Sequence, residues 1–186
     1  MQKGLIIKAI SGEYKIITDE REEFVCKPRG LFRYKEKTPK VGDIVDFDLK
    51  TRIILRIHPR RNELDRPIIA NLDKAFLTFS VREPDLNLNL LDRLISIVEY
   101  NDIEIVIVFT KLDLLADKGE FEPIRAYYEK IGYRVYTSGF GLPYDEIKAE
   151  VNDNVCCFAG QSGVGKSTLL NFFDHTLNLK TQEISE

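Results

Sequence analysis

Glycines, a lysine and three hydroxyl side chains occur at a phosphate-binding spacing in the segment Gly160-Gln-Ser-Gly-Val-Gly-Lys-Ser-Thr168. The segment matches the pattern Gly-x4-Gly-Lys-[Ser/Thr] completely, and this pattern forms the P-loop between a strand and a helix. Its glycines let the backbone turn N–H groups against phosphate oxygens, and a helix beginning near Gly165 adds the positive end of its dipole. Lys166 supplies a mobile charge to the β and γ phosphates, and the Ser167 hydroxyl can ligate Mg²⁺. The segment therefore predicts a site for a nucleoside triphosphate or its diphosphate product.

A second segment, Thr110-Lys-Leu-Asp113, directly follows the apolar stretch 103–109. In GTPases, an Asn/Thr-Lys-x-Asp stretch stands at the end of such a strand. Its carboxylate accepts two hydrogen bonds from guanine, and the stem of its lysine lies along the base. Adenine lacks that pair of donors, so a buried Asp113 would be left unpaired against it, which is unfavourable. Beside a P-loop, this segment predicts guanine recognition.

A weaker match, Thr137-Ser138-Gly139, follows the next predicted strand, where GTPases carry a turn whose backbone contacts the guanine oxygen. The alternative is a P-loop ATPase or kinase in which the segment from Thr110 to Asp113 is incidental. Lys166 is the predicted catalytic residue and Ser167 the predicted magnesium ligand. The predicted nucleotide-binding residues are Thr110, Lys111, Leu112, Asp113, Thr137, Ser138, Gly160, Gln161, Ser162, Gly163, Val164, Gly165, Lys166, Ser167 and Thr168.

The elements that must position these residues alternate between strand and helix. Helical apolar spacing and short apolar runs distinguish the two kinds of element. Four such alternations indicate a parallel sheet covered by helices. The predicted strands cover residues 75–80, 103–109, 133–137 and 154–159, and the predicted helices cover residues 88–100, 121–131, 143–151 and 166–173.

The first 57 residues are instead typical of β structure. Five short stretches rich in β-branched residues, 5–10, 14–18, 23–26, 44–48 and 53–57, are separated by turn residues. Such strands suit a small closed barrel of the OB type, and an SH3-like barrel is the alternative that strand number does not exclude. The polar, proline-bounded stretch 59–67 marks a boundary. We therefore expect an OB-fold RNA-binding domain over 1–62 and a P-loop domain over 68–186.

Composition indicates a folded protein, since 44% of the 186 residues are hydrophobic and 31% are charged. The formal net charge of −3 argues against nonspecific nucleic-acid binding by the whole chain but permits a local basic patch. Cys26, Cys156 and Cys157 match neither a disulfide framework nor zinc spacing. The chain shows no signal peptide, and no segment approaches the roughly 20 apolar residues that cross a bilayer.

A local basic patch is predicted around the loop that follows Cys26. Phe32 and Tyr34 interleave with its cations, as an OB-fold loop that grips RNA would require. The same residues could also be an ordinary solvated loop. The predicted RNA-binding residues are Lys27, Arg29, Arg33, Lys35, Lys37 and Lys40.

The order of the motifs is unusual, because the guanine segment precedes the P-loop, whereas an ordinary GTPase has the P-loop first. A domain whose termini lie close together tolerates such circular permutation. In this order of motifs and in its N-terminal β module, the chain resembles the circularly permuted, ribosome small-subunit-dependent GTPases of bacteria. The resemblance extends to the segments Arg61-Asn-Glu-Leu-Asp-Arg-Pro67, Ala70-Asn-Leu-Asp-Lys74 and Leu91-Asp-Arg93. Arg29-Gly30 and Pro39-Lys-Val-Gly-Asp43 also resemble the OB-fold of that family.

The resemblance runs from about Gly4 to the last residue and implies a fold and a function. The expected fold is an N-terminal all-β OB-type barrel, then an α/β P-loop GTPase domain that is circularly permuted and incomplete at its C-terminus. The implied function is GTP hydrolysis, with GTP or GDP and Mg²⁺ bound, during late maturation of the small ribosomal subunit and in contact with its rRNA. It further implies a cytoplasmic monomer without a membrane partner, and a zinc domain whose ligands lie outside this chain.

Two departures from the family bear on activity. Threonine stands at position 110 where the family usually has asparagine, and its hydroxyl can still hydrogen-bond toward the P-loop. No Asp-x-x-Gly, the segment that senses the γ-phosphate, occurs in the sequence, and the region of the family's switch threonine is missing. His175 is the only histidine after the P-loop, and we expect an ordinary exposed role for it. We therefore expect a truncated or incomplete protein, and a non-hydrolysing fragment that binds guanine nucleotide and RNA is the alternative function.

Overall fold

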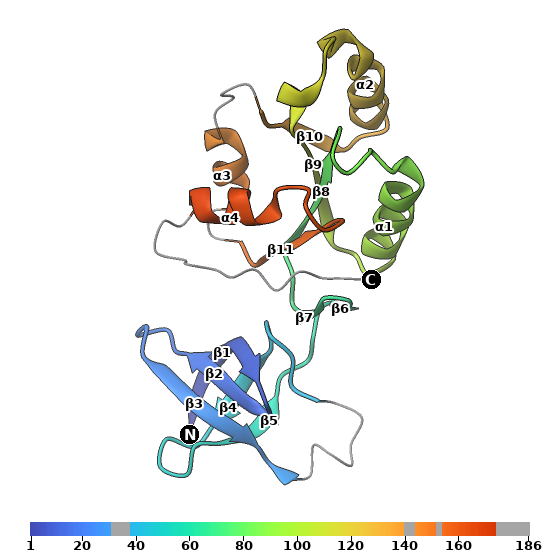
Figure 1. Ribbon diagram of the computed structural model, residues 1–186. Helices are drawn as coiled ribbons and strands as arrows, with labels where there is room; N and C mark the ends of the chain where they lie inside the picture. The colour runs from blue at the N-terminus through green and yellow to red at the C-terminus, as the bar shows by residue number, and fades with distance from the viewer. Residues whose placement is uncertain (31–37, 140–143, 152–153, 174–186) are drawn as a thin grey trace. The chain divides into compact units, whose positions relative to one another are not determined.

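The computed structural model describes residues 1–30, 38–139, 144–151 and 154–173 (Figure 1). The chain divides into two compact units, Met1–Leu72 and Asp73–Glu186. This division lies later in the chain than the limits 1–62 and 68–186 that the sequence suggests. The reason is that part of the stretch 59–67, expected as a boundary, folds with the residues after it. There β6 (Glu63–Asp65) pairs antiparallel with β7 (Ile68–Ala70) in a short hairpin.

The first unit contains a closed five-stranded barrel. Its strands are β1 (Gln2–Ile10), β2 (Glu13–Ile17), β3 (Glu23–Pro28), β4 (Ile44–Phe47) and β5 (Ile53–Ile57), in the order β1-β2-β3-β5-β4. β1 pairs with both β2 and β4 to close the barrel, and β3 pairs with β5 in parallel. The prediction of an OB-type barrel is confirmed.

The barrel encloses one apolar core, because alternate residues of each strand point inward. Phe47 and Ile54 are fully buried in it, and partly buried Phe24 packs on Phe47 with ring centroids 5.2 Å apart. The buried cluster consists of Ile6, Tyr14, Ile16, Cys26, Val45, Phe47 and Ile54.

A buried ion pair ties the barrel to the chain that leads into the hairpin. The carboxylate of Asp43 has no exposed surface and accepts hydrogen bonds from Arg60 Nε at 2.7 Å and Nη2 at 2.9 Å. Arg60 also contacts Glu63 on β6 at 2.5 Å, and Lys40 Nζ lies 2.8 Å from the same carboxylate. Two carboxylates and two cations thus satisfy one another, as buried charges require.

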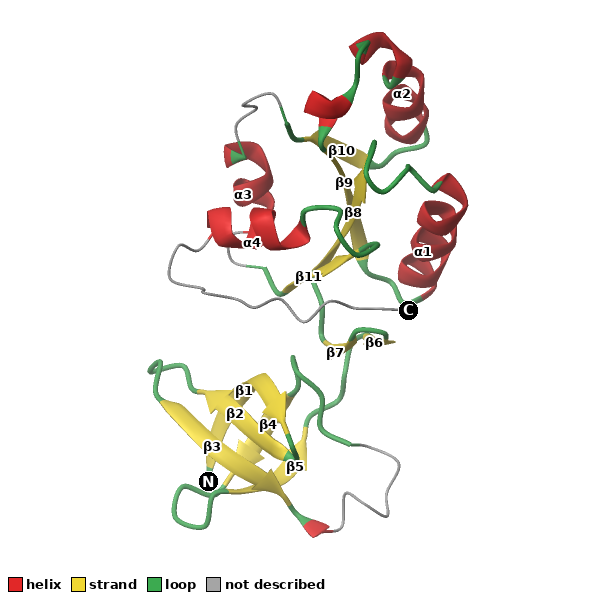
Figure 2. Cartoon of the chain, in the orientation of Figure 1, coloured by secondary structure: helices red, strands yellow, loops and turns green. Residues whose placement is uncertain are grey.

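The second unit is an α/β domain built on a parallel sheet (Figure 2). β8 (Lys74–Ser80), β9 (Glu104–Thr110), β10 (Arg134–Thr137) and β11 (Cys156–Ala159) follow the order β10-β9-β8-β11, and every neighbouring pair is parallel. In Figure 1, α1 (Leu88–Tyr100) and α2 (Glu122–Lys130) lie on one face of the sheet. The other face carries α3 (Asp145–Val151) and α4 (Lys166–Phe173). The sequence predicts these four helices but not their division between the two faces.

Both faces of this sheet are buried, which explains the continuous apolar runs of its central strands. On one face, Phe76 and Val106 pack in a cluster with Ile147 of α3. On the other face, the ring of Phe109 packs edge-on against Phe121 with centroids 4.8 Å apart. The same packing brings the carboxyl ends of β8, β9 and β11 to one edge, where ligands of open α/β sheets bind.

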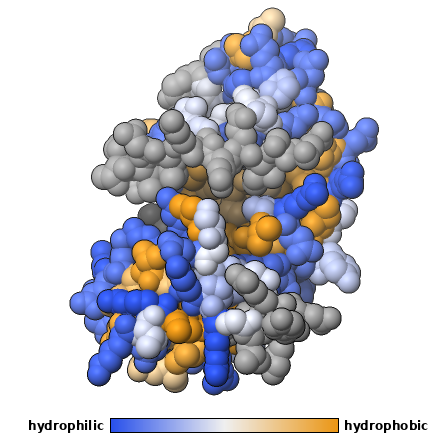
Figure 3. All heavy atoms as spheres, turned by 60° about the horizontal axis from the view of Figure 1, so that its bottom comes forward, coloured by the Kyte–Doolittle hydropathy of each residue, from blue (hydrophilic) through white to orange (hydrophobic). Residues whose placement is uncertain are grey.

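Hydrophilic residues cover most of the described part of the face seen in Figure 3. In the view of Figure 3, hydrophobic residues lie in separate groups between hydrophilic ones. None of the helices in the described ranges is long and apolar enough to cross a membrane.

Candidate nucleotide-binding site

The P-loop follows β11 directly and takes a backbone path that requires glycine. Gly160, Gly163 and Gly165 have φ angles of 148°, 78° and 95°. A Cβ on Gly160 would lie 1.9 Å from the carbonyl oxygen of Thr78 on the neighbouring strand β8. The first glycine of the motif is therefore fixed by close approach of two strands as well as by its dihedral angle.

Lys166 is the first residue of α4 and folds back over the loop. Its ammonium donates hydrogen bonds to the carbonyl oxygens of Gly160 at 2.9 Å and Gln161 at 2.5 Å. The helix is joined to the loop by the bond from Leu169 N–H to the Gly165 carbonyl at 3.1 Å. The arrangement places a cation and the N-terminus of α4 beside the loop, which is the charge pattern that attracts phosphate.

The remaining P-loop residues divide by exposure. Val164 is fully buried and anchors the loop, whereas Ser162 and Thr168 are exposed. Ser167 lies in the first turn of α4 and is partly exposed. Mg²⁺ keeps several water ligands and takes others from substrate phosphates, so a single hydroxyl at this position fits a magnesium ion.

The guanine segment begins at the end of β9 and is joined to the P-loop. Thr110 is 4% exposed, and its hydroxyl donates to the carbonyl of Val164 at 2.5 Å. The hydrogen bond that we expected threonine to make in place of asparagine is present. The segments predicted to bind the base and the phosphates, distant in sequence, thus meet through one hydroxyl group.

The residues after Thr110 pack against the turn that follows β10. Ser138 is 3% exposed, its N–H donates to the Phe109 carbonyl at 2.8 Å, and its own carbonyl accepts from Leu112 N–H at 3.1 Å. A Cβ on Gly139 would lie 2.5 Å from Asp113 Oδ1, so glycine makes room for that carboxylate. The structure therefore brings the weak Thr137-Ser138-Gly139 match to the guanine segment.

Asp113 itself is exposed, unlike the buried carboxylate that our argument against adenine assumed. A bound base that covers the Asp113 carboxylate would remove it from water, and adenine would then leave it without hydrogen-bond donors. Lys111 has a φ of 60°, and its ammonium donates to the carbonyl of Glu83 in the segment between β8 and α1.

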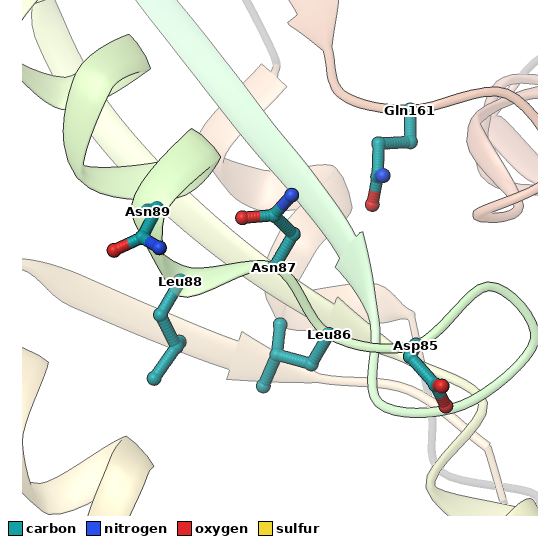
Figure 4. Close-up of a pocket in the computed structure, with 6 residues that line it drawn as sticks. All are labelled: Asp85, Leu86, Asn87, Leu88, Asn89 and Gln161. Carbon is teal, nitrogen blue, oxygen red and sulfur yellow. The ribbon is translucent and has the colours of Figure 1, made fainter.

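The segment between β8 and α1 is a part of the site that sequence reasoning missed. Residues Asp85–Asn89 and Gln161 line a pocket of about 420 Å³ (Figure 4). Figure 4 shows the Gln161 side chain reaching from the P-loop toward this segment. Asn87 caps α1, since its side chain accepts from Leu90 N–H at 3.0 Å. A signal was available in the sequence, because a loop that follows a parallel strand emerges at the same edge as the P-loop.

Family models match both units of the chain. The model of the RsgA N-terminal domain matches residues 3–53, and that of the RsgA GTPase matches residues 57–186. The chain belongs to the RsgA GTPase family. The circular permutation that the motif order indicates is confirmed, because a similar solved structure is described as a circularly permuted GTPase.

Curated relatives named RsgA agree with this membership. The chain is 46% identical to "small ribosomal subunit biogenesis GTPase RsgA 2" of Oceanobacillus iheyensis and 45% identical to the RsgA protein of Halalkalibacterium halodurans. Both matches cover the whole chain, which spans 66% and 65% of the length of these two relatives.

Two crystal structures share the fold. YjeQ from Thermotoga maritima superposes with a TM-score of 0.83 at 30% identity, over 96% of this chain and 67% of its own. YloQ, described as a circularly permuted GTPase, superposes with a TM-score of 0.76 at 42% identity, over 95% of this chain and 66% of its own.

The basic residues predicted to bind RNA are not equally available on the RsgA-type barrel. Lys27 is 72% exposed beside Glu13, and Arg29 is exposed. Lys40 is only 14% exposed, with its ammonium 2.8 Å from Glu63 and 3.1 Å from Asp65. Arg33, Lys35 and Lys37, with Phe32 and Tyr34, lie outside the described residues.

The barrel adds a cation that the sequence analysis missed. Arg52, in the turn between β4 and β5, accepts at its carbonyl a 2.9 Å hydrogen bond from Lys27 N–H. Its guanidinium lies 4.4 Å from the ring centroid of Phe24. Lys50 stands exposed in the same turn. This turn lies beside Lys27 because β3 pairs with β5. The two segments are far apart in the sequence, so the sequence alone does not show that they are neighbours.

The three cysteines are unpaired thiols. Burial raises the pKa of Cys156 to about 11 and that of Cys157 to about 12, so both remain protonated and poor ligands. Within the described ranges, no group of three or more His, Cys, Asp and Glu residues is placed to hold a metal ion. His175 lies outside these ranges.

Proposed function

We propose that this chain binds GTP and GDP with Mg²⁺ and hydrolyses GTP in the maturation of the small ribosomal subunit. The observation that carries the proposal is the hydrogen bond from Thr110 to Val164, which joins the guanine segment to the P-loop. One ligand can therefore contact both segments. The small ribosomal subunit is inferred from the names of the relatives, and the reaction class is inferred from the family.

For nucleotide binding, each segment has a separate role. The P-loop N–H groups and the N-terminus of α4 would surround the β-phosphate, and Lys166 would turn from its two carbonyl partners toward the β and γ phosphates. Ser167 would hold Mg²⁺, which neutralises phosphate charge. Asp113 would accept two hydrogen bonds from guanine, with the turn of Thr137 and Ser138 behind the base.

For hydrolysis, these residues supply positioning and charge neutralisation, which dominate phosphoryl transfer. Lys166 is the catalytic residue we assign, since its ammonium can follow the charge that develops on the γ-phosphate. The water that attacks must be oriented by a group that we do not assign to any described residue.

For the subunit, the proposed contact is rRNA on the barrel. Lys27, Arg29 and Arg52 present exposed cations from β3 and the β4–β5 turn, the part of an OB-fold that often holds nucleic acid. Lys40 contributes less than we expected, because its charge is already balanced by Glu63 and Asp65. We further propose a cytoplasmic monomer.

A second candidate is guanine-nucleotide binding without hydrolysis. The observation that favours it is the lack of any Asp-x-x-Gly in the 186 residues. Such a chain would bind GTP and GDP through the same residues and leave GTP intact.

Turnover of GTP by the 186-residue chain, alone and with purified small subunits, separates the two candidates. The proposal expects phosphate release that rises when subunits are added and disappears in Lys166→Ala. Binding of GTP with no release under either condition would support the second candidate and exclude the first for this chain.

A further inference from the structure

The segment from Ser80 to Pro84, which leaves β8 for α1, lies between the guanine segment and the P-loop. Its first N–H, on Val81, donates to the carbonyl of Thr110 at 3.1 Å. Its later carbonyl, on Glu83, accepts from the ammonium of Lys111. The segment is thus fixed at two points to two consecutive residues of the guanine segment.

The P-loop bounds the same segment on another side. A Cβ built on Gly163 would lie 3.9 Å from Pro84 Cδ, which is ordinary van der Waals contact. Gly163 therefore faces the proline ring across a narrow gap. A displacement of residues 83 and 84 would therefore change the contacts of both Lys111 and the P-loop.

Ser80 holds this segment in shape. It is the last residue of β8, is 1% exposed, and donates from Oγ to the carbonyl of Pro84 at 2.7 Å. The bond closes a turn across the peptide that links Glu83 to Pro84. The direction of the Glu83 carbonyl, and so the place of the Lys111 ammonium, depends on this closure.

We propose that Ser80 is a positioning residue for the purine base, acting through the Glu83 carbonyl on Lys111. The lysine stem lies along the base only while its ammonium is held at the far side. Without the anchor, the four-carbon chain regains rotamer freedom that base binding must then remove. This inference rests on the guanine-nucleotide site proposed above and adds a residue that touches no ligand.

The test compares three variants of the full 186-residue chain: Ser80→Ala, Lys111→Met, which keeps the stem and removes the ammonium, and both together. Calorimetry measures the Kd of GDP with Mg²⁺ and, separately, the Kd of pyrophosphate, which contacts only the phosphate part of the site. Ser96→Ala is the matched control, because Ser96 also donates to a carbonyl, that of Asp92 at 3.0 Å, on the exposed side of α1.

The expected result is a Kd for GDP raised about three- to tenfold in Ser80→Ala, with pyrophosphate affinity within about twofold of the unchanged protein. Ser80→Ala should add nothing in the Lys111→Met background, because both changes remove the same contact. Ser96→Ala should leave both affinities unchanged.

Equal losses for GDP and pyrophosphate in Ser80→Ala would overturn the inference, since they would indicate general damage to the loop. Additive effects of the two substitutions would overturn it as well. If the unchanged protein binds GDP no more tightly than pyrophosphate, the proposed base site itself fails. That outcome differs from a Ser80→Ala effect that is independent of Lys111.

Discussion

The hydroxyl of Thr110 lies 2.5 Å from the carbonyl oxygen of Val164, fifty-four positions along the chain. Thr110 is the last residue of β9 and Val164 is a fully buried residue of the P-loop. This hydrogen bond joins the segment that we propose to bind the base to the P-loop.

Thr110→Val keeps the shape of the side chain and removes the donor. A buried carbonyl is then left without this partner, so we expect a loss of about 1–3 kcal/mol in the free energy of unfolding. The affinity for GDP should also fall, because the two halves of the site are no longer held together. Urea denaturation and calorimetric titration with GDP measure the two effects.

Thr78→Val is the matched change on the neighbouring strand, with the opposite expectation. Thr78 is fully buried, and in the described part of the chain its hydroxyl finds no hydrogen-bond partner. Valine removes an unpaired polar group, so the free energy of unfolding should stay equal or rise by about 1 kcal/mol. A destabilisation of the size expected for Thr110→Val would contradict this reading of both sites.

Gly160→Ala should abolish nucleotide binding, because the new methyl group would stand 1.9 Å from the Thr78 carbonyl oxygen and must push β8 and β11 apart. Gly163→Ala is the comparison. Its φ of 78° is also unfavourable for alanine, but the nearest atom, on Pro84, is 3.9 Å away. It should lose about 1–2 kcal/mol of stability and keep the fold. Melting temperature and GDP titration rank the two variants.

Stability should fall at acid pH through the charge cluster that ties the barrel to the hairpin. A hydrogen bond from Lys40, with the charge of Arg60, lowers the pKa of Glu63 below its ordinary value of 4.5. Because the folded-state pKa is the lower one, this contribution is complete above pH 4.5 and is lost as pH falls through the folded-state value.

Urea denaturation of the unchanged protein and Glu63→Gln, at pH 6 and at pH 3.5, measures the pH effect. The difference in unfolding free energy between the two proteins should shrink at the lower pH. A difference that stays constant would show that Glu63 does not contribute to the acid sensitivity.

Much of the fold is readable from the sequence, because its signals are local. Helical apolar spacing predicts residues 88–100, which form α1 from Leu88 to Tyr100. The strands of the parallel sheet are apolar because both of their faces are buried, and their predicted bounds differ from the observed ones by a residue or two. The five barrel strands are recovered because β-branched stretches and the turn residues between them are also local signals.

The hairpin of β6 and β7 could not be read in this way. Each strand has three residues, too few to show an alternation of two, and Glu63 and Asp65 suggest a solvated linker. Its position depends on Arg60 and the buried Asp43, whose contact joins positions 17 residues apart. A contact between two residues so far apart in the sequence leaves no local pattern from which it could be predicted.

In the candidate site, too, the contiguous motif could be predicted from the sequence, whereas contacts between separate segments could not. The P-loop is a contiguous motif whose geometry follows from its glycines, so its residues could be assigned from spacing alone. The contacts of Lys111 with Glu83, and of Lys27 with Arg52, join separate segments and depend on the sheet order and the barrel closure. The place of Lys40 in a basic stretch predicts RNA binding, but in the fold its ammonium pairs with Glu63 and Asp65.

Competition of GDP and ADP against a fluorescent guanine nucleotide, bound to the chain with Mg²⁺, tests guanine recognition most directly. GDP should displace the probe at a concentration at least about a hundredfold below that of ADP, because only guanine satisfies the carboxylate of Asp113 once the base covers it. Displacement at equal concentrations would contradict the claim that Thr110 to Asp113 and the P-loop together form a guanine-nucleotide site.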